Sequence, residues 1–170
     1  MSKLASTVSL TAALSAALLL GAASPSPVAG HPIVTGHGKW EIPAGTVGFQ
    51  ISLVELPDGS LNGHGRSTLH SASGISWFRF VVTEYQYVGD ELAVAGLIVD
   101  TFNTPPTFLG SQTFLLIQDN GSGGAPDKAI SASGIPPSFS LAQVLSLPPP
   151  LGPPPPEFWF PLAGGNFTIH

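Results

Sequence analysis

Alternation of apolar and polar side chains is the feature that most constrains what this chain can fold into. It is clearest between Thr46 and Leu53, where every second side chain is apolar. The apolar set is Val47, Phe49, Ile51 and Leu53, and the set between them is Gly48, Gln50 and Ser52. A two-residue period indicates a β-strand with one buried face, because successive side chains point to opposite sides of the sheet.

Further strand-like runs follow the same rule, and turn sequences separate them. Ser76–Val88 predicts a long or bent strand, whereas Leu92–Val99 and Thr113–Ile117 are apolar on both faces, as central strands are. Other strands are expected at Thr35–Ile42, Leu61–Leu69, Lys128–Ser133 and Asn166–His170. Tight turns are indicated at Pro57-Asp58-Gly59, Gly89-Asp90 and Asn120-Gly121.

The fold class follows from the number of these runs and from the lack of helical periodicity. Seven to nine short strands joined by tight turns predict an all-β fold, either a small antiparallel barrel or a sandwich. We favour the barrel, because closure removes exposed strand edges and a C-terminal strand can pair with the first one. The sequence has no cysteine, so the fold must be held by its core rather than by disulfides.

Residues 136–161 break the strand pattern and predict a proline-rich loop before the last strand. Proline cannot donate to a strand ladder, and the four prolines of 153–156 favour polyproline II. One helical turn or two at most are expected within Leu141–Leu147. The loop either docks into an aromatic groove of a partner or only returns the chain to its final strand. Composition alone supports docking, so we favour the second interpretation.

The first residues predict export from the cytoplasm. A short start with Lys3 precedes the uncharged, apolar run Leu4–Ala23, and small residues and prolines follow it. This order is typical of a secretory signal peptide, so we expect residues 1–23 to be cleaved, 24–32 to form a linker and 33–170 to form a single β domain, secreted or periplasmic. The serines and threonines of the run weaken the other interpretation, an uncleaved membrane anchor, and no membrane span is expected after cleavage.

Charge restricts the partners of this domain. Only 9% of the residues are charged, against about 25% in typical soluble domains. Cleavage removes Lys3 and leaves four basic and ten acidic residues, too few scattered cations to predict nucleic acid or an anionic lipid surface as a partner. An uncharged polar surface suits contact with a cell surface, a matrix or a glycan, and a small apolar ligand is a further candidate.

The sequence signatures of catalysis are missing. There is no cysteine nucleophile, G-x-S-x-G elbow, P-loop, H-E-x-x-H motif or G-x-G-x-x-G fingerprint. We therefore favour a protein that is not an enzyme, and calcium is the one cofactor to consider. Among the histidines, His37 and His64 can share a metal only if their strands are neighbours. Arg79, Glu84 and Asp100 lie in strand-like runs and can pair inside a barrel.

Asp119, Asn120 and Asp127 bracket the most suggestive loop of the sequence. The loop follows an apolar strand and places oxygen side chains among glycines. Calcium binds roughly six to eight oxygens on an adaptable loop, so these three residues are candidate calcium ligands. The other interpretation is a hairpin, in which Asn-Gly makes the turn and both aspartates accept hydrogen bonds from local amides. We favour the hairpin, because glycine rather than oxygen ligands fills most of the loop.

Phe158, Trp159 and Phe160 form an aromatic cluster at the end of the proline-rich segment. Together with Arg79 they are the candidate ligand-binding residues, since such rings can stack on a sugar. More often such a cluster plugs one end of a core, because each ring buries a large area, and we favour the plug.

Two short motifs in the last two-thirds of the chain resemble those of a known group. The run Phe114–Asp127 has a D-x-G…D loop after a strand, and Gly164–His170 reads G-G-N-x-x-x-H. In both respects the chain resembles a group of uncharacterised exported bacterial β domains, from which the proline-rich insertion between the motifs departs. Because that group has no established activity, the resemblance implies a β fold and export only.

Three functions follow as hypotheses, and the interior of the domain separates them. A filled core favours a non-catalytic extracytoplasmic β domain that makes surface or structural contacts, which is our leading hypothesis. An open apolar cavity favours a calycin-like barrel that binds a small apolar ligand. A cavity that contains Arg79, Glu84 or Asp100 favours a small barrel isomerase or cyclase.

Overall fold

The computed structural model describes residues 30–121, 125–147 and 159–170. The expected signal peptide, residues 1–23, and most of the expected linker, residues 24–32, lie outside these ranges. The first strand already begins at His31, which is earlier than the expected start of the domain at residue 33.

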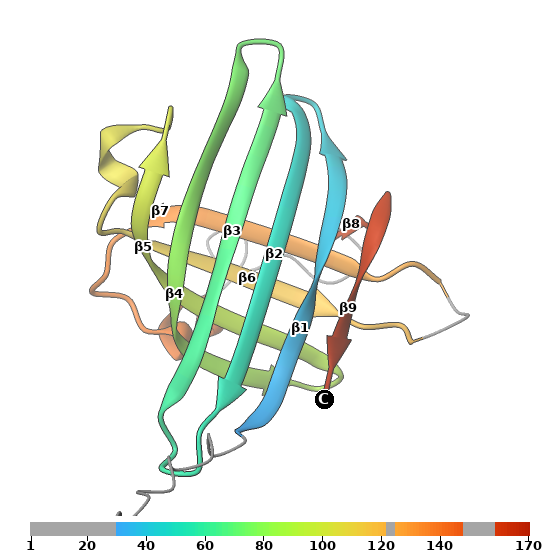
Figure 1. The fold of residues 1–170 in the computed structure, drawn as a ribbon, viewed down its shortest axis with the longest axis vertical. Coiled ribbons are helices and arrows are strands. Elements are labelled where there is room, and N and C mark those ends of the chain that lie inside the picture. The colour runs from blue at the N-terminus through green and yellow to red at the C-terminus, as the bar shows by residue number, and fades with distance from the viewer. Residues whose placement is uncertain (1–29, 122–124, 148–158) are drawn as a thin grey trace, which may run out of the picture.

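Within these ranges the chain forms nine strands in one antiparallel sheet that curls into a half-barrel (Figure 1). The strands are β1 (His31–Ile42), β2 (Gly45–Glu55), β3 (Leu61–Ser71), β4 (Gly74–Val88), β5 (Glu91–Phe102), β6 (Gln112–Gln118), β7 (Lys128–Ile135), β8 (Phe160–Pro161) and β9 (Gly164–Ile169). Their order across the sheet is β8-β7-β6-β5-β4-β3-β2-β1-β9. The all-β prediction is confirmed, and so is the pairing of the last strand with the first.

The long strands give the sheet its curl. In Figure 1, β1 to β3 run along the long axis of the molecule, and β6 and β7 cross behind them. β4 joins the two directions, and its register with β5 shifts between Arg79 and Phe80 and again between Val82 and Glu84. Such bulges bend a strand and increase its twist. The bent strand expected at Ser76–Val88 is therefore part of β4.

Large apolar side chains fill the concave side of the sheet. The alternation of β2 places Phe49, Ile51 and Leu53 there, each almost fully buried. Phe80 of β4 packs on Phe49 with ring centroids 5.4 Å apart. Gly65 of β3 makes room for this packing, because a Cβ at that position would collide with the ring of Phe80. The main core also contains Val34, Trp40, Phe78, Val82, Leu92, Val94, Ile98, Leu115, Ile117 and Phe167.

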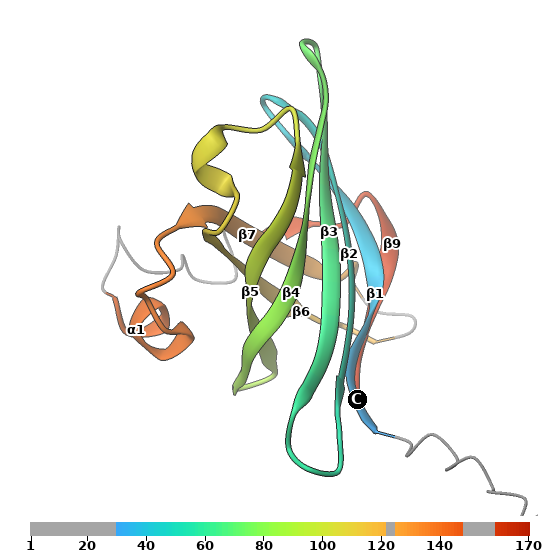
Figure 2. The same cartoon turned by 60° about the vertical axis from the view of Figure 1, so that its left-hand side comes forward.

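A second, smaller core covers the opposite face of β5 and β6. It consists of Ala93, Ala95, Phe114, Leu116, Leu141 and Trp159. Leu141 belongs to the short helix α1 (Leu141–Ser146), which Ser140 and Gln143 begin with a reciprocal capping box. The backbone N–H of Leu141 donates to Glu84 Oε2 of β4 at 2.8 Å, which holds the helix against the sheet. Figure 2 shows α1 well away from β1 and β2.

The segment expected to be a proline-rich loop, residues 136–161, contains the short helix that was predicted within Leu141–Leu147: residues 141–146 form α1, and Ser140 supplies its N-cap. It differs from the expectation at its end, where Phe160–Pro161 form β8, paired with β7. Residues 148–158 lie outside the described ranges. After β8 the chain joins the two ends of the curled sheet: Leu162 N donates to Asp127 O at 2.9 Å, and Ala163 N donates to Lys39 O at 2.7 Å.

Candidate functional site

The two aspartates that bracket the candidate calcium loop bind the last strand. Asp127 Oδ2 accepts from Phe167 N at 2.9 Å, and Asp119 Oδ2 accepts from Ile169 N at 3.0 Å. Both donors belong to β9, whose other edge pairs with β1. The carboxylates therefore satisfy backbone amides that a free strand edge would leave unpaired.

The second oxygen of each carboxylate binds a local amide. Asp127 Oδ1 accepts from Asn120 N at 2.9 Å, and Asp119 Oδ1 accepts from Gly121 N at 2.7 Å. Asn120 Nδ2 donates to Pro126 O at 2.7 Å. Asp127 is buried, with 5% of its surface exposed, so these amides are what compensate its desolvation. Among the residues that the structure describes, no three His, Asp or Glu side chains are grouped to hold a metal ion.

The candidate ligand-binding residues do not form one site. Trp159 is buried in the second core, whereas Phe160 packs against the main core on the other side of β8. Phe158 lies outside the described ranges. Arg79 lies on the convex face of β4, where its Nε donates to Asp100 Oδ2 of β5 at 3.0 Å and the two side chains form an ion pair. Neither of these charges is part of the core.

The histidines also lie on the convex face rather than at a shared metal position. His37 is on β1 and His64 is on β3, and β2 lies between these strands. The glycines that flank each histidine point into the core, as Gly65 does beside Phe80, while the histidine itself is exposed.

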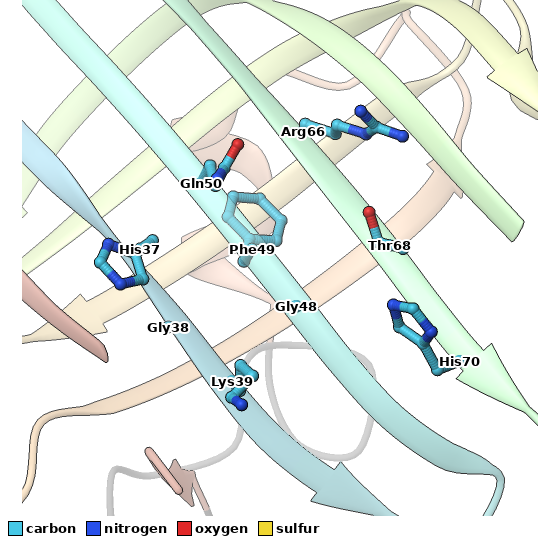
Figure 3. A pocket seen from close by; sticks show the side chains of 9 residues that line it. All are labelled: His37, Gly38, Lys39, Gly48, Phe49, Gln50, Arg66, Thr68 and His70. Atoms are coloured by element: carbon cyan, nitrogen blue, oxygen red, sulfur yellow. The ribbon is translucent and has the colours of Figure 1, made fainter. Parts of the chain in front are cut away.

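The convex face of β1–β3 contains an open depression of about 300 Å³, whose lining is shown in Figure 3. Gly48 of β2 is its floor, because it pairs with Lys39 on one side and with Thr68 on the other and has no side chain of its own. The remaining lining residues are His37, Gly38, Phe49, Gln50, Arg66 and His70. The depression thus brings together two cations, two imidazoles, an amide and a hydroxyl, with no carboxylate in its lining.

A second depression of about 300 Å³ adjoins this one, shares Gln50 and Arg66 with it, and is lined on its other sides by residues such as His64 and Arg79. The Arg66 guanidinium lies over the ring of Trp77, 4.6 Å from its centroid. On the next strand Phe102 stacks on Trp77 with ring centroids 5.9 Å apart. Cation–π attraction restrains the guanidinium on an otherwise exposed face.

The sequence alone gave little sign of this basic face. Lys39, Arg66 and Arg79 are three of the four basic residues that follow the expected cleavage position, and they are far apart in the sequence. Antiparallel register places them on neighbouring rows of β1, β3 and β4. The expectation of scattered cations therefore fails for this face. The one sequence feature that could have indicated this face is the alternation of the strands, which places each of these side chains on the side of the sheet that faces away from the core.

Apolar side chains are exposed beside the basic face. Ile75, Val81, Val99 and Phe102 of β4 and β5 each expose between 46 and 55% of their surface. Exposed apolar residues that gather on one face are typical of interaction surfaces.

Comparisons with protein-family models, with curated proteins and with solved structures find no match. The fold and the face described above define a barrel-like, all-β protein with a filled core and a basic convex face. No helix in the described ranges is long and apolar enough to cross a bilayer.

Proposed function

We propose that this protein is an exported, non-catalytic β domain that makes surface or structural contacts through the convex face of β1–β5. The observation that carries the proposal is the contrast between the two sides of these strands. Phe49, Phe80 and their neighbours fill the concave side, whereas the convex side exposes cations and large apolar residues such as Phe102. A face of this kind offers both charge and apolar area to a partner.

The positions of the strand charges support a contact role over an isomerase or cyclase. Such an enzyme needs polar groups inside its cavity. Arg79 and Asp100 instead pair with each other on the convex face, and Glu84 accepts the first amide of α1. None of the three is available to act on a substrate held within the core.

A second candidate function, binding of a small apolar ligand, is favoured by one cavity. It has a volume of about 200 Å³ and lies between β3, β4 and the 3₁₀ turn Pro106–Phe108, lined by Leu69, Phe78 and Phe108 among others. Thr104 Oγ1 is buried there and has no hydrogen-bond partner in the described part of the chain. If the cavity binds a small alcohol, that ligand raises the melting temperature of the wild type and not of Thr104→Val.

Fractionation of the producing cells tests the leading proposal. We expect the protein in the envelope or extracellular fraction, with an N-terminus between residues 22 and 31. Phe102→Ser should lower the fraction that washed envelopes retain, because it removes exposed apolar area from the proposed face. Phe139→Ser is the matched control, since Phe139 is also exposed but precedes α1. An intact Met1 in the cytoplasm, or equal retention of both variants, would contradict the proposal.

A further inference from the structure

The two convex depressions form one elongated track. Arg66 and Gln50 line both of them, and together they extend along β3 from His70 to His64. Six residues of an extended strand span about 20 Å. A track of this length suits a segment of a polymer better than a single small ion.

Charge complementarity indicates that this polymer is acidic. Lys39 lies beside the floor at Gly48, Arg66 lies diagonally across it beside Gln50, and no carboxylate lines either depression. Two acidic side chains of the neighbouring strands already have partners: Asp100 pairs with Arg79, which lines the second depression, and Glu41 accepts from Thr46 Oγ1 at 2.9 and 3.0 Å. The track is therefore a local positive site on a chain whose net charge is −5.

The geometry of Arg66 favours an oxyanion in this track. Stacking over Trp77 fixes the plane of the guanidinium before a ligand arrives, so less side-chain freedom is lost on binding. A planar guanidinium donates two parallel hydrogen bonds to a carboxylate. Lys39, on the opposite side of Gly48, adds a second positive charge.

The uncharged groups of the track distinguish a sugar polymer from a phosphate polymer. No side-chain hydrogen bond joins His37, Gln50 or His70 to another residue within the described ranges, so the imidazoles and the amide are available to a ligand. An acidic sugar has one carboxylate among several hydroxyls, which matches two cations among several uncharged hydrogen-bonding groups. A polyphosphate chain also has a charge at every unit, but it has no hydroxyls for the imidazoles and the amide to bind.

From this arrangement we propose that the track binds a carboxylated polysaccharide, with one uronate carboxylate held by Arg66, a second carboxylate near Lys39, and the sugar chain passing over Gly48 between them. This inference rests on the proposed contact function and names the partner of the same face. The ligand segment lies along β2 and β3, and its hydroxyls bind Gln50, Thr68 and the two imidazoles.

Gly48→Val is the decisive variant, because it fills the floor without disturbing the strand. A Cβ at Gly48 has only the Thr68 carbonyl oxygen within 4 Å, at the ordinary distance of 3.9 Å, and Gly48 is not among the residues with positive φ. Thr83→Val places the same side chain on the exposed face of β4, outside both depressions, and is the matched control. Gly48→Val should melt no lower than the wild type, and Thr83→Val should lose only what the long hydrogen bond from Thr83 Oγ1 to Ala95 O, at 3.4 Å, contributes.

The binding experiment uses the mature protein and polygalacturonate, with its fully methyl-esterified form as the uncharged counterpart. We expect the wild type and Thr83→Val to bind the acid and not the ester, more weakly as salt rises. Gly48→Val and Arg66→Gln should each weaken binding by about tenfold or more, the ratio that corresponds to one charge-assisted hydrogen bond. Lys128→Gln removes the same charge from β7 and should bind as the wild type does.

Four results would overturn the inference: no binding of polygalacturonate, equal binding of the ester, full binding by Gly48→Val, or tighter binding of polyphosphate than of polygalacturonate. The last result would make the track a general polyanion site. None of these results decides the contact function, which is tested by the retention of Phe102→Ser on envelopes. If envelopes retained Phe102→Ser and Phe139→Ser equally while the protein still bound polygalacturonate, the proposed contact function would be contradicted and the track would not.

Discussion

The convex faces of β2–β3 and of β5–β6 belong to the same sheet and differ in what lies over them. On β2 and β3 this face consists of side chains such as Gln50 and Arg66, and both are exposed. On β6 the same face presents Phe114 and Leu116, buried under α1 and Trp159. Alternation of apolar and polar residues is therefore visible in the sequence only for strands with one solvent-exposed face. The half of the sheet whose convex face is exposed is also the half that is free to bind a partner.

The largest difference between the two halves is expected in the free energy of unfolding, when a side chain on the convex face is truncated to alanine. Phe114→Ala should lower the free energy of unfolding by about 3–5 kcal/mol, because Phe114 is 1% exposed and leaves a cavity in the second core. Gln50→Ala, on the exposed convex face of β2, should change it by less than about 0.5 kcal/mol. Urea denaturation of both variants measures the difference. Similar losses in the two would show that the halves are covered alike.

A smaller effect is expected where the two halves meet, at Asp127 between β7 and β9. In the wild type one oxygen of Asp127 accepts from Phe167 N and the other accepts from Asn120 N. Asp127→Asn turns one of these two acceptors into an NH2 donor, so one of the two hydrogen bonds is lost. A lost hydrogen bond to a charged group costs about 1.5–3 kcal/mol, and thermal unfolding should show a loss of that size. Asp58→Asn, at the exposed β2–β3 turn, is the control and should matter much less.

The wild type and the Asp127→Asn variant together test the calcium interpretation. If the loop bound calcium in the native state only, calcium at 100 times its Kd would add about 2.7 kcal/mol of stability. We expect equal melting temperatures in calcium and in EDTA, because backbone amides already occupy both oxygens of Asp119 and Asp127. A rise in calcium that Asp127→Asn abolishes would restore calcium as a ligand.

The smallest effect is a pH dependence at Tyr85 of β4, which packs against the main core. Tyr85 Oη donates to Glu55 Oε2 at 2.7 Å, and this hydrogen bond raises the pKa of Tyr85 to about 12. The pKa of an unfolded tyrosine is about 10, so the native state holds this proton more tightly. The stabilisation is fully present below pH 10 and is lost as the pH rises from 10 to 12. Ultraviolet titration should show an ionisation near pH 12 that Tyr85→Phe removes.

Sequence alone determined the local part of the structure. The two-residue period of β2, the double-sided apolar runs of β5 and β6 and the turns between them all depend on residues near one another in the chain, so composition and spacing were enough to predict them. The pairing of β9 with β1 was also predictable, since closing a curled sheet removes its edges. The short helix α1 was predicted within Leu141–Leu147, whereas the strand β8 was not, because the prolines around it obscured two residues of regular structure.

Only the tertiary structure decided which side chains meet. One oxygen of each of Asp119 and Asp127 accepts from a local amide, as the hairpin interpretation predicted, whereas the other accepts from an amide 50 or 40 residues further along the chain, which the sequence did not predict. Lys39 and Arg66 line the same depression because antiparallel register sets Lys39 beside Gly48 and Arg66 beside Gln50, two residues further along β2. A period of two says which way a side chain points, whereas its lateral neighbours depend on register and curl. For this reason the sequence predicted the core of the protein, and the structure was needed to find the face that we propose binds its partner.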